Sequence, residues 1–342
     1  MRLDTSKLGT GERPPLGLAL GGGVARGWAH IGALKALMEA DIRPDIVAGT
    51  SIGSVVGAAY LAGKLESLER WARSLDRRKV LHYTDLSWGG SGLVKGVRLR
   101  KVLEHYLRGV NIEDFDRKFA AVTCDLRTGY EVWMQSGPVI PAVQASYALP
   151  GAFEPVEVDG RFMIDGALVN PVPVSACRAM GAHMVIAVSL SGDAFGPIGT
   201  SHEVAFEAED MEVDEDLPEI AILAQQSLNK IRPDRVLLKS LLGGAKPGKS
   251  PRIGSVMMGS LNIVMDRIGR SRLAGDPPDV LVAPRIGHIG MLEFTRADEL
   301  IERGYRAMQH EIPLIRSVMD ILGEIPGGRA PDAPDGHKGA VD

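Results

Sequence analysis

Gly49-Thr50-Ser51-Ile52-Gly53 lies between an apolar segment and a run of small residues, and this stretch decides the fold. The segment before it, residues 45–48, is typical of a buried strand, and residues 54–61 are small and apolar as in a buried helix. A serine on such a strand-to-helix turn takes a strained backbone conformation and projects its hydroxyl away from the sheet. Gly49 and Gly53 let neighbouring backbone pass close by. Ser51 is therefore a candidate nucleophile, at the positive end of the following helix.

The residues upstream repeat the same alternation of strand and helix. Residues 16–20 predict a buried strand that ends in the loop Gly21-Gly22-Gly23, and a helix follows from about Trp28 to Ala40. Pro44 then begins a second strand. Strand, glycine loop, helix, strand, turn and helix is the order expected of an open α/β sheet.

Further elements follow along the chain. Helical patterns occupy residues 65–77 and 98–108. Two hairpins are predicted, one pairing 118–124 with 130–135, the other pairing 155–158 with 162–164 around Asp159-Gly160. Residues 184–189 and 280–283 are expected to form the last strands.

Composition indicates a globular protein without a nucleic-acid partner. The chain has 342 residues and a formal net charge of −4, so no excess of positive charge favours nucleic-acid binding. Its two cysteines, Cys124 and Cys177, are expected to be reduced structural thiols of a cytoplasmic protein. The absence of a CxxC motif and of Cys/His clusters with metal spacing predicts that no metal is bound.

The sequence predicts a soluble protein. Its first seven residues lack an apolar core, so we expect no signal peptide. Residues 46–63 are uncharged and long enough to suggest a membrane span. The glycines and serines inside this stretch favour the strand–turn–helix interpretation instead.

Residues 193–275 have an unusual distribution of charge. Residues 193–219 are acidic and contain no Lys or Arg, whereas the segment that follows is basic. One interpretation is a mobile loop followed by solvated helices. The other is a lid or lipid-facing flap, because basic and apolar residues mix there as at an interfacial surface. The apolar residues are Leu237, Leu238, Leu241, Leu242, Met257 and Met258.

Acyl transfer from a serine requires hydrogen-bond donors for the oxyanion, and the candidate is Gly21-Gly22-Gly23-Val24-Ala25-Arg26-Gly27. Glycines leave backbone N–H groups unobstructed where the chain enters a helix. Arg26 either adds charge or holds the loop through carbonyl contacts. The loop does not fit the dinucleotide fingerprint, because Arg26 or Val24 stands where that pattern requires glycine.

The serine also requires a base. Among eight histidines, His288 is the best triad candidate by chain order, whereas His30, beside the glycine loop, suits a packing or surface role. Asp165 competes with them, since Asp165-Gly166-Ala167 follows a predicted strand and glycine permits close approach to another loop. Burial would raise the low pKa of an aspartate toward that of a useful base. Asp-Gly after a strand is also a common turn, so the motifs alone do not decide which residue is the base.

Together these motifs resemble the patatin-like phospholipases. Residues 21–27, 49–53 and 165–167 occur in the order and context of that family, and residues 146–155 and 165–173 resemble segments typical of its bacterial members. The resemblance covers about residues 14–190, with the later helices matching loosely.

The resemblance implies an α/β fold, a three-layer sandwich with a mostly parallel central sheet and helices on both faces. The domain would span residues 14–322, with a variable insertion at 193–275. The tail at 323–342 is rich in Pro, Gly and charged residues, a composition that predicts disorder. A Ser–Asp dyad is implied, in which Ser51 attacks an ester carbonyl and Asp165 is the general base without a histidine. The implied oxyanion loop comprises Gly21, Gly22, Gly23, Val24 and Arg26, and the supporting glycines are Gly49, Gly53 and Gly166. Many members have a glycine where Val24 stands, which leaves the donor amides open.

The implied activity is hydrolysis of carboxylic esters in phospholipids, lysophospholipids or simple esters. It requires no metal and no organic cofactor. Transient contact with a membrane surface is expected, with a cytoplasmic location, peripheral at the membrane. Two alternatives remain: a regulatory or scaffolding member without activity, and a general esterase or protease that uses the same serine.

Overall fold

The computed structural model describes residues 14–83, 92–94, 96–191 and 253–324 of the chain. Contacts divide the chain into two units, one formed by Met1–Phe195 with Ser271–Asp342 and the other by Gly196–Arg270. Of the second unit, the structure describes only part of α10 (Ile253–Gly275). The predicted acidic segment, most of the basic one and the predicted tail from 325 onward lie outside the described residues.

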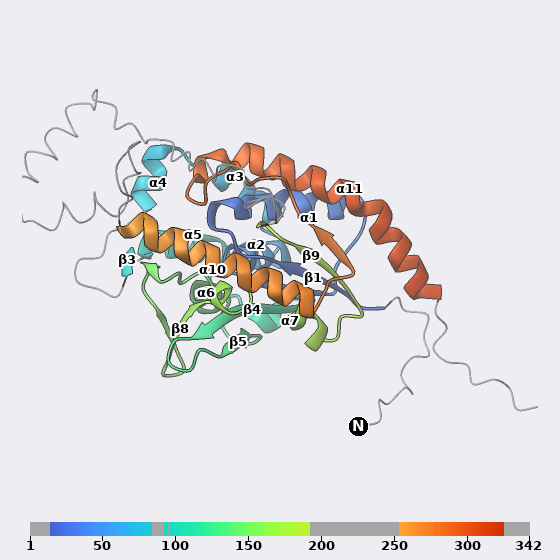
Figure 1. Cartoon of the computed structure of the whole chain (residues 1–342), viewed down its shortest axis with the longest axis horizontal. Coiled ribbons are helices and arrows are strands. Elements are labelled where there is room, and N and C mark those ends of the chain that lie inside the picture. The colour runs from blue at the N-terminus through green and yellow to red at the C-terminus, as the bar shows by residue number, and fades with distance from the viewer. Residues whose placement is uncertain (1–13, 84–91, 95, 192–252, 325–342) are drawn as a thin grey trace, which may run out of the picture. The chain divides into compact units, whose positions relative to one another are not determined.

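The first unit contains a mixed sheet whose strands β10, β9, β1, β2 and β4 run parallel (Figure 1). Across the sheet the order is β10-β9-β1-β2-β4-β8-β7, and β5 pairs with β4. At the β4 side, β5 and β8 each pair antiparallel with β4, and β7 pairs antiparallel with β8. The bounds are β1 Leu16–Leu20, β2 Ile46–Thr50, β4 Lys118–Asp125, β5 Glu131–Met134, β7 Val156–Val158, β8 Arg161–Asp165, β9 Met184–Val188 and β10 Val280–Val282. A separate pair joins β3 (Gly92–Val94) to β6 (Gly151–Phe153).

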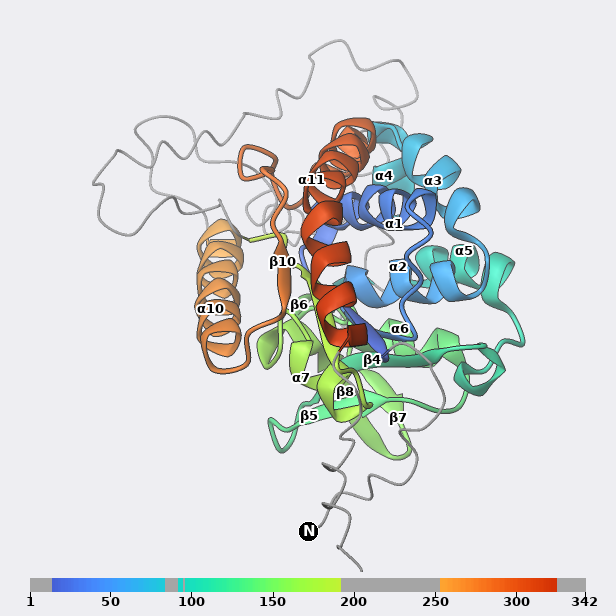
Figure 2. The ribbon, with the colours of Figure 1, turned by 90° about the vertical axis from the view of Figure 1, so that its right-hand side faces the viewer.

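Helices cover both faces of this sheet (Figure 2). One face packs against α1 (Ala29–Glu39), α2 (Ile52–Leu61), α3 (Leu65–Arg73), α5 (Val97–Leu107), α6 (Val139–Ser146) and α11 (Ala297–Glu324). The other face packs against α7 (Val174–Ala179). The predicted α/β architecture with helices on both faces is confirmed.

Alternation along β1 explains the two faces. Its three leucines, at 16, 18 and 20, point into the larger core, whereas Gly17 and Ala19 face α7. A Cβ at position 17 would lie 2.7 Å from the Ala182 Cβ and 3.0 Å from the Cys177 Cβ. The small residues therefore let α7 approach the sheet closely.

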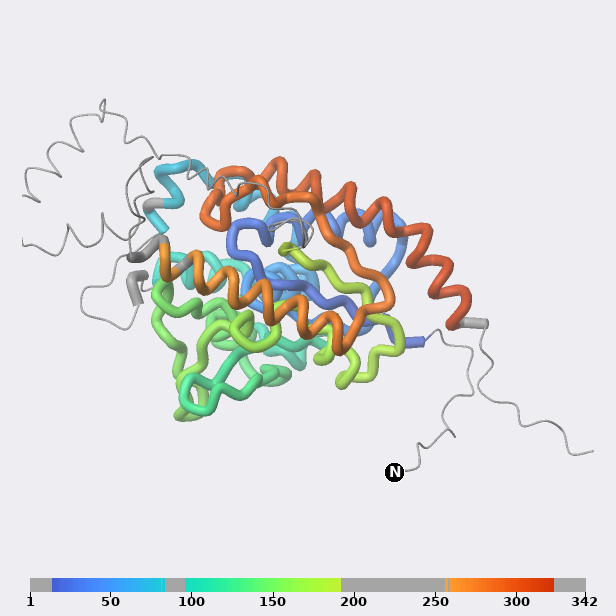
Figure 3. Tube along the Cα trace, in the orientation of Figure 1, coloured from blue at the N-terminus to red at the C-terminus, as the bar shows by residue number. Residues whose placement is uncertain are grey.

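The longest described helix, α11, lies alongside α1 (Figure 3). A Cβ at Gly32 of α1 would lie 1.8 Å from the Ile301 carbonyl oxygen, and one at Gly304 would lie 1.9 Å from the Ala29 carbonyl oxygen. Only glycine fits at these two crossing points. The close contact joins α11 to the helix that follows the glycine loop.

Most predicted elements are present, with two kinds of difference. The Asp159-Gly160 hairpin is confirmed, with φ of 49° and 72° at its two turn residues. The predicted helix over 65–77 is wrong in its extent, because α3 ends at Arg73 and α4 (Arg77–Tyr83) is a separate helix. The sequence prediction did not include α6 and α11.

Both cysteines are free and buried, as expected for structural thiols. Burial raises the pKa of the Cys177 thiol to about 12. Among the described helices, none combines the length and the hydropathy that a membrane span requires.

Candidate active site

The predicted turn after β2 forms a sharp strand-to-helix elbow at Ser51. This residue is the N-cap of α2, with φ 55° and ψ −125°, a region that side chains rarely occupy. A Cβ at Gly53 would lie 2.2 Å from the Leu20 carbonyl oxygen, and one at Gly49 would lie 2.5 Å from the Ser54 Cα. The elbow therefore requires glycine on both sides of the serine.

Ser51 and Asp165 meet at this elbow. The Ser51 Oγ donates a hydrogen bond of 2.7 Å to Asp165 Oδ2, and the Ala167 N–H donates one of 2.8 Å to Asp165 Oδ1. Asp165 ends β8, which is held beside β4 by the pairing of Asp165 with Thr123. Gly166 is required next to it, because a Cβ there would lie 2.2 Å from the Val122 carbonyl oxygen.

Burial changes the proton affinity of the carboxylate. Desolvation raises the pKa of Asp165 to about 7, opposed by the hydrogen bonds from the Ala167 N–H and the Ser51 hydroxyl. A carboxylate with a pKa near neutrality is a better base for an alcohol than one with the ordinary value. The environment thus gives Asp165 the property that a general base needs.

His288, the rival base, and His30, beside the glycine loop, both have partners other than Ser51 and Asp165. His288 Nε2 is 2.7 Å from Glu299 Oε1, and its side chain is 45 % exposed. His30 donates from Nε2 to the Gly21 carbonyl oxygen at 2.7 Å, and burial lowers its pKa to about 4. Within the described ranges, no histidine forms a hydrogen bond with Ser51 or Asp165.

The glycine loop lies beside the serine, but its amides are not equivalent. The Gly21 N–H donates to the Val188 carbonyl oxygen at 3.0 Å, and the Gly22 N–H donates to the Pro171 carbonyl oxygen at 2.9 Å. The N–H groups of Gly23 and Val24 have no acceptor in the part of the chain that the structure describes. A Cβ at Gly22 would lie 3.5 Å from the Ser51 Cβ.

Val24 begins the short helix η2 (Val24–Trp28) with φ 52°, in the left-handed region. A β-branched residue is strained there. The resemblance to a family noted from the sequence implies glycine at this position.

Arg26 holds the neighbouring loop. Its Nε donates to the Ile289 carbonyl oxygen at 2.7 Å, and its Nη2 donates to the Gly287 carbonyl oxygen at 3.2 Å. Of the two roles that the sequence left open for Arg26, these contacts correspond to the second, holding a loop through carbonyl oxygens.

One residue of the site was given no role by the sequence. The Ser51 N–H donates to the Ser146 Oγ at 2.9 Å, and the Ser146 Oγ in turn donates to the Val122 carbonyl oxygen at 2.7 Å. Ser146 begins a family-like segment, and that resemblance was the only signal in the sequence. The contact itself spans 95 residues of chain.

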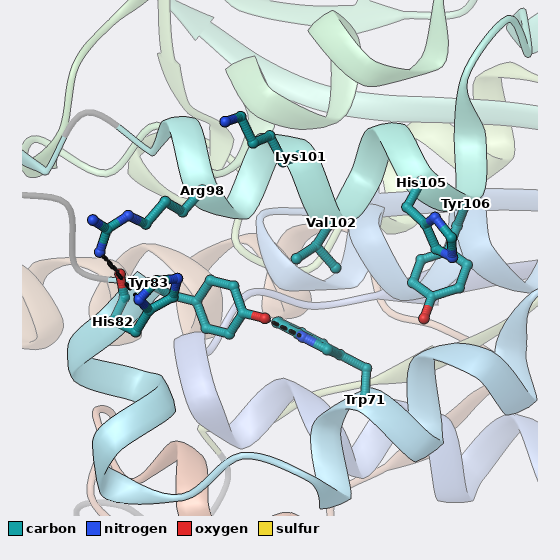
Figure 4. A pocket seen from close by; sticks show the side chains of 8 residues that line it. All are labelled: Trp71, His82, Tyr83, Arg98, Lys101, Val102, His105 and Tyr106. Carbon is teal, nitrogen blue, oxygen red and sulfur yellow. Dashed lines mark hydrogen bonds between the residues drawn. The ribbon is translucent and has the colours of Figure 1, made fainter.

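A cavity of about 510 Å³ lies between α3, α4 and α5 (Figure 4). Aromatic and basic side chains line it, among them Trp71, Tyr83 and Lys101. Neither Ser51 nor Asp165 lines this cavity. Trp71 packs edge-on against Trp28 of η2, with ring centroids 5.7 Å apart, so the cavity wall contacts the helix that continues the glycine loop.

Across the described residues, no group of three His, Cys, Asp or Glu side chains is placed to hold a metal ion.

Comparisons with known proteins identify relatives. A family model described as patatin-like phospholipase matches residues 18–178. An uncharacterized NTE family protein of Mycobacterium tuberculosis is 32 % identical over 321 residues, covering 85 % of this chain and 89 % of that protein. The patatin-like phospholipase domain-containing protein 6 of Homo sapiens is 34 % identical over 183 residues, covering 51 % of this chain and 13 % of that protein. The crystal structure of VipD from Legionella pneumophila aligns with 91 % of this chain and 67 % of its own, at 13 % identity and a TM-score of 0.46.

Proposed function

The chain belongs to the patatin-like phospholipase family, and we propose that it is a serine lipid acyl hydrolase that works through Ser51 and Asp165. Membership of the family supports hydrolase activity on lipids in general. The observation that carries the finer proposal is the 2.7 Å hydrogen bond between the Ser51 Oγ and Asp165 Oδ2, in a buried site.

In the proposed first step, the Ser51 Oγ attacks the ester carbonyl carbon while Asp165 accepts the hydroxyl proton. The tetrahedral intermediate collapses, the ester bond breaks, and Asp165 returns the proton to the departing alcohol. Water then attacks the acyl-enzyme and gives a proton to Asp165. The second tetrahedral intermediate collapses, the bond between the Ser51 Oγ and the acyl carbon breaks, and Asp165 returns its proton to the Ser51 Oγ as the carboxylic acid leaves.

We assign the oxyanion donors to the N–H groups of Gly23 and Val24. Hydrogen bonds to carbonyl oxygens already occupy the N–H groups of Gly21 and Gly22. Of the five residues predicted for the oxyanion loop, the assignment therefore keeps two as donors. The positive end of α2 at Ser51 adds a favourable potential for the same negative charge.

The proposed substrates are phospholipids, lysophospholipids and simple carboxylic esters, reached at a membrane surface. The described part of α10 supports surface contact, because Val256, Met257, Ile263 and Val264 are 46 % to 60 % exposed. The first and third of these residues are seven positions apart, as are the second and fourth, so they share one helix face. An exposed apolar helix face of this kind suits an interfacial contact. We propose a cytoplasmic protein that attaches transiently to a lipid surface.

Two other functions are considered: a regulatory or scaffolding protein without activity, and a general esterase or protease. The hydrogen bond between Ser51 and Asp165 argues against the first, because a scaffold does not need the pair in contact. A substrate series separates all three. Phospholipids, p-nitrophenyl esters of increasing chain length and a peptide ester are offered to the native protein and to Ser51→Ala.

A lipid hydrolase prefers the phospholipid or the long-chain ester and loses this activity in Ser51→Ala. Activity that is confined to short esters or peptides would contradict the lipid assignment. For the membrane contact, Met257→Glu with Val264→Glu should weaken binding to anionic liposomes. Ser271→Glu with Ala274→Glu, at two other exposed positions of α10, adds the same charge and is the matched control.

A further inference from the structure

The segment that ends α6 contacts both residues of the proposed catalytic pair. The Ser146 Oγ accepts the Ser51 N–H at 2.9 Å, and two residues further on, the Ala148 carbonyl oxygen accepts the Asp165 N–H at 3.0 Å. Ser146 is fully buried. One short segment thus holds the backbone of the nucleophile and the backbone of the base.

The Ser51 N–H depends on this contact. As the N-cap of α2, Ser51 is at a position where the backbone N–H has no partner within the helix. The residue is 6 % exposed, so water cannot readily replace a lost protein acceptor. Its backbone is also held at φ 55°, a conformation that the surroundings must maintain.

The second hydrogen bond of Ser146 ties the elbow to the strand beside the base. Its Oγ donates to the Val122 carbonyl oxygen at 2.7 Å. The next residue of β4, Thr123, is the register partner of Asp165. The chain of contacts from the Ser51 N–H through Ser146 therefore joins the elbow to β4, the strand that lies between β2 and β8.

We infer that Ser146 is a positioning residue, which fixes the Ser51 hydroxyl against Asp165 by bridging the Ser51 N–H to the Val122 carbonyl oxygen. This inference rests on the proposed Ser51–Asp165 chemistry. It adds that the Ser51–Asp165 pair needs a third residue, Ser146, to hold its geometry.

Ser54 provides a matched control. It is also a fully buried serine whose hydroxyl bonds to the Ser51 backbone, donating to the Ser51 carbonyl oxygen at 2.6 Å. That bond stays within the first turn of α2 and reaches no other strand. Ser146→Ala and Ser54→Ala each remove one buried hydroxyl beside Ser51, but only the first removes the bridge.

The test compares kcat, KM, the rate of labelling by a fluorophosphonate probe and the thermal midpoint for the native protein, Ser146→Ala and Ser54→Ala. Misplacement of a reacting group by about 1 Å costs on the order of 100-fold, so kcat and labelling of Ser146→Ala should fall about 10- to 100-fold. KM should change less than about threefold, because the bridge is proposed to place the reacting serine and not to bind the substrate. Ser54→Ala should keep kcat within about threefold at a similar loss of thermal stability.

The pH profile gives a readout that a purely structural role would not change. The Ser51 hydrogen bond lowers the pKa of Asp165, so loss of that geometry should move the midpoint of the profile to higher pH in Ser146→Ala and not in Ser54→Ala. If Ser146→Ala fails to fold, Ser146→Cys keeps the size with weaker hydrogen bonding and should show a reduced kcat. Native kcat in a folded variant at position 146, or equal losses in Ser54→Ala, would overturn the inference. Activity that survives in Ser51→Ala would instead overturn the proposed function.

Discussion

The Ser51 Oγ lies 2.7 Å from Asp165 Oδ2, and the carboxylate that accepts its hydrogen bond is only 2 % exposed. No cationic side chain among the described residues forms an ion pair with Asp165. The charge of the carboxylate is stabilised instead by two hydrogen bonds, from the Ser51 hydroxyl and the Ala167 N–H. We therefore expect the protonation of Asp165 to change both the proposed activity and the stability of the protein.

Activity should rise with pH through a single step. Only the ionised carboxylate accepts the Ser51 proton, and burial raises the pKa of Asp165 to about 7. We expect kcat/KM for a p-nitrophenyl ester, measured from pH 5 to 9, to increase to a plateau with a midpoint near 7. His288→Ala should give the same profile. A midpoint that moves or disappears in that variant would assign the titration to histidine.

Asp165→Asn should stabilise the folded protein at alkaline pH. The folded protein holds the Asp165 proton up to about pH 7, whereas the unfolded chain releases it near the ordinary aspartate pKa of 3.8. The folded state thus binds more protons between these values, and through this group stability falls as pH rises from about 4 to about 7. Asparagine removes a cost of as much as ~4 kcal/mol above pH 7.

Urea unfolding at pH 4 and pH 8 measures this difference. The variant should exceed the native protein in free energy of unfolding at pH 8 and match it at pH 4. His30 titrates in the opposite sense, because burial lowers its pKa to about 4, but it is present in both proteins and cancels. Equal free energies of unfolding for Asp165→Asn and the native protein at pH 8 would show that burial of the ionised Asp165 does not destabilise the fold.

Val24→Gly should be more stable than Val24→Ala. The left-handed φ of 52° costs a residue with a Cβ about 1–2 kcal/mol, and glycine about nothing. Glycine in an ordinary helix is instead about 1 kcal/mol less stable than alanine. Chemical denaturation of the two variants shows directly which has the larger free energy of unfolding. An alanine variant that is the more stable of the two would contradict the strained conformation.

Arg26→Lys should be almost as destabilising as Arg26→Met. Lysine keeps the charge but cannot span the carbonyl oxygens of Gly287 and Ile289, to which the guanidinium donates. Loss of hydrogen bonds from a charged group costs about 1.5–3 kcal/mol each, so the thermal midpoint should fall in both variants. Native stability and activity in Arg26→Lys would indicate that the charge matters and the carbonyl contacts do not.

Features that are local in sequence were predictable. The elbow glycines were identified because β2, Ser51 and α2 follow one another directly, and the strand alternation of β1 is visible in five residues. Asp165 was singled out because it ends a strand before glycine, although the sequence alone left His288 as a rival. The resemblance to a family, rather than periodicity, favoured the aspartate.

Features set by distant contacts were not predictable. The helix α6 contains Pro141 and β-branched residues, which are poor helix formers, and packing against α2 and β4 stabilises it. Sequence patterns therefore gave no reason to place Ser146 beside Ser51. The difference between the Gly22 and Gly23 amides likewise depends on the Pro171 carbonyl oxygen, which is far away in the chain.

The missing prediction of α11 has another cause. Its buried residues Ile301, Met308 and Ile315 recur every seven positions, a pattern that the sequence does contain. Pro313 interrupts the helical pattern and makes the continuous helix hard to recognise.

The most direct test of the proposed mechanism is to measure kcat for a lysophospholipid with the native protein, Ser51→Ala, Asp165→Asn and His288→Ala at pH 8. Asparagine keeps the size of Asp165 and one acceptor oxygen for the Ala167 N–H, but its amide cannot accept the serine proton. Loss of a general base costs about 10²–10⁴-fold, so Asp165→Asn should lose that much, Ser51→Ala should be inactive and His288→Ala should stay close to the native rate. Native activity in Asp165→Asn, with activity lost in His288→Ala, would contradict the Ser51–Asp165 mechanism.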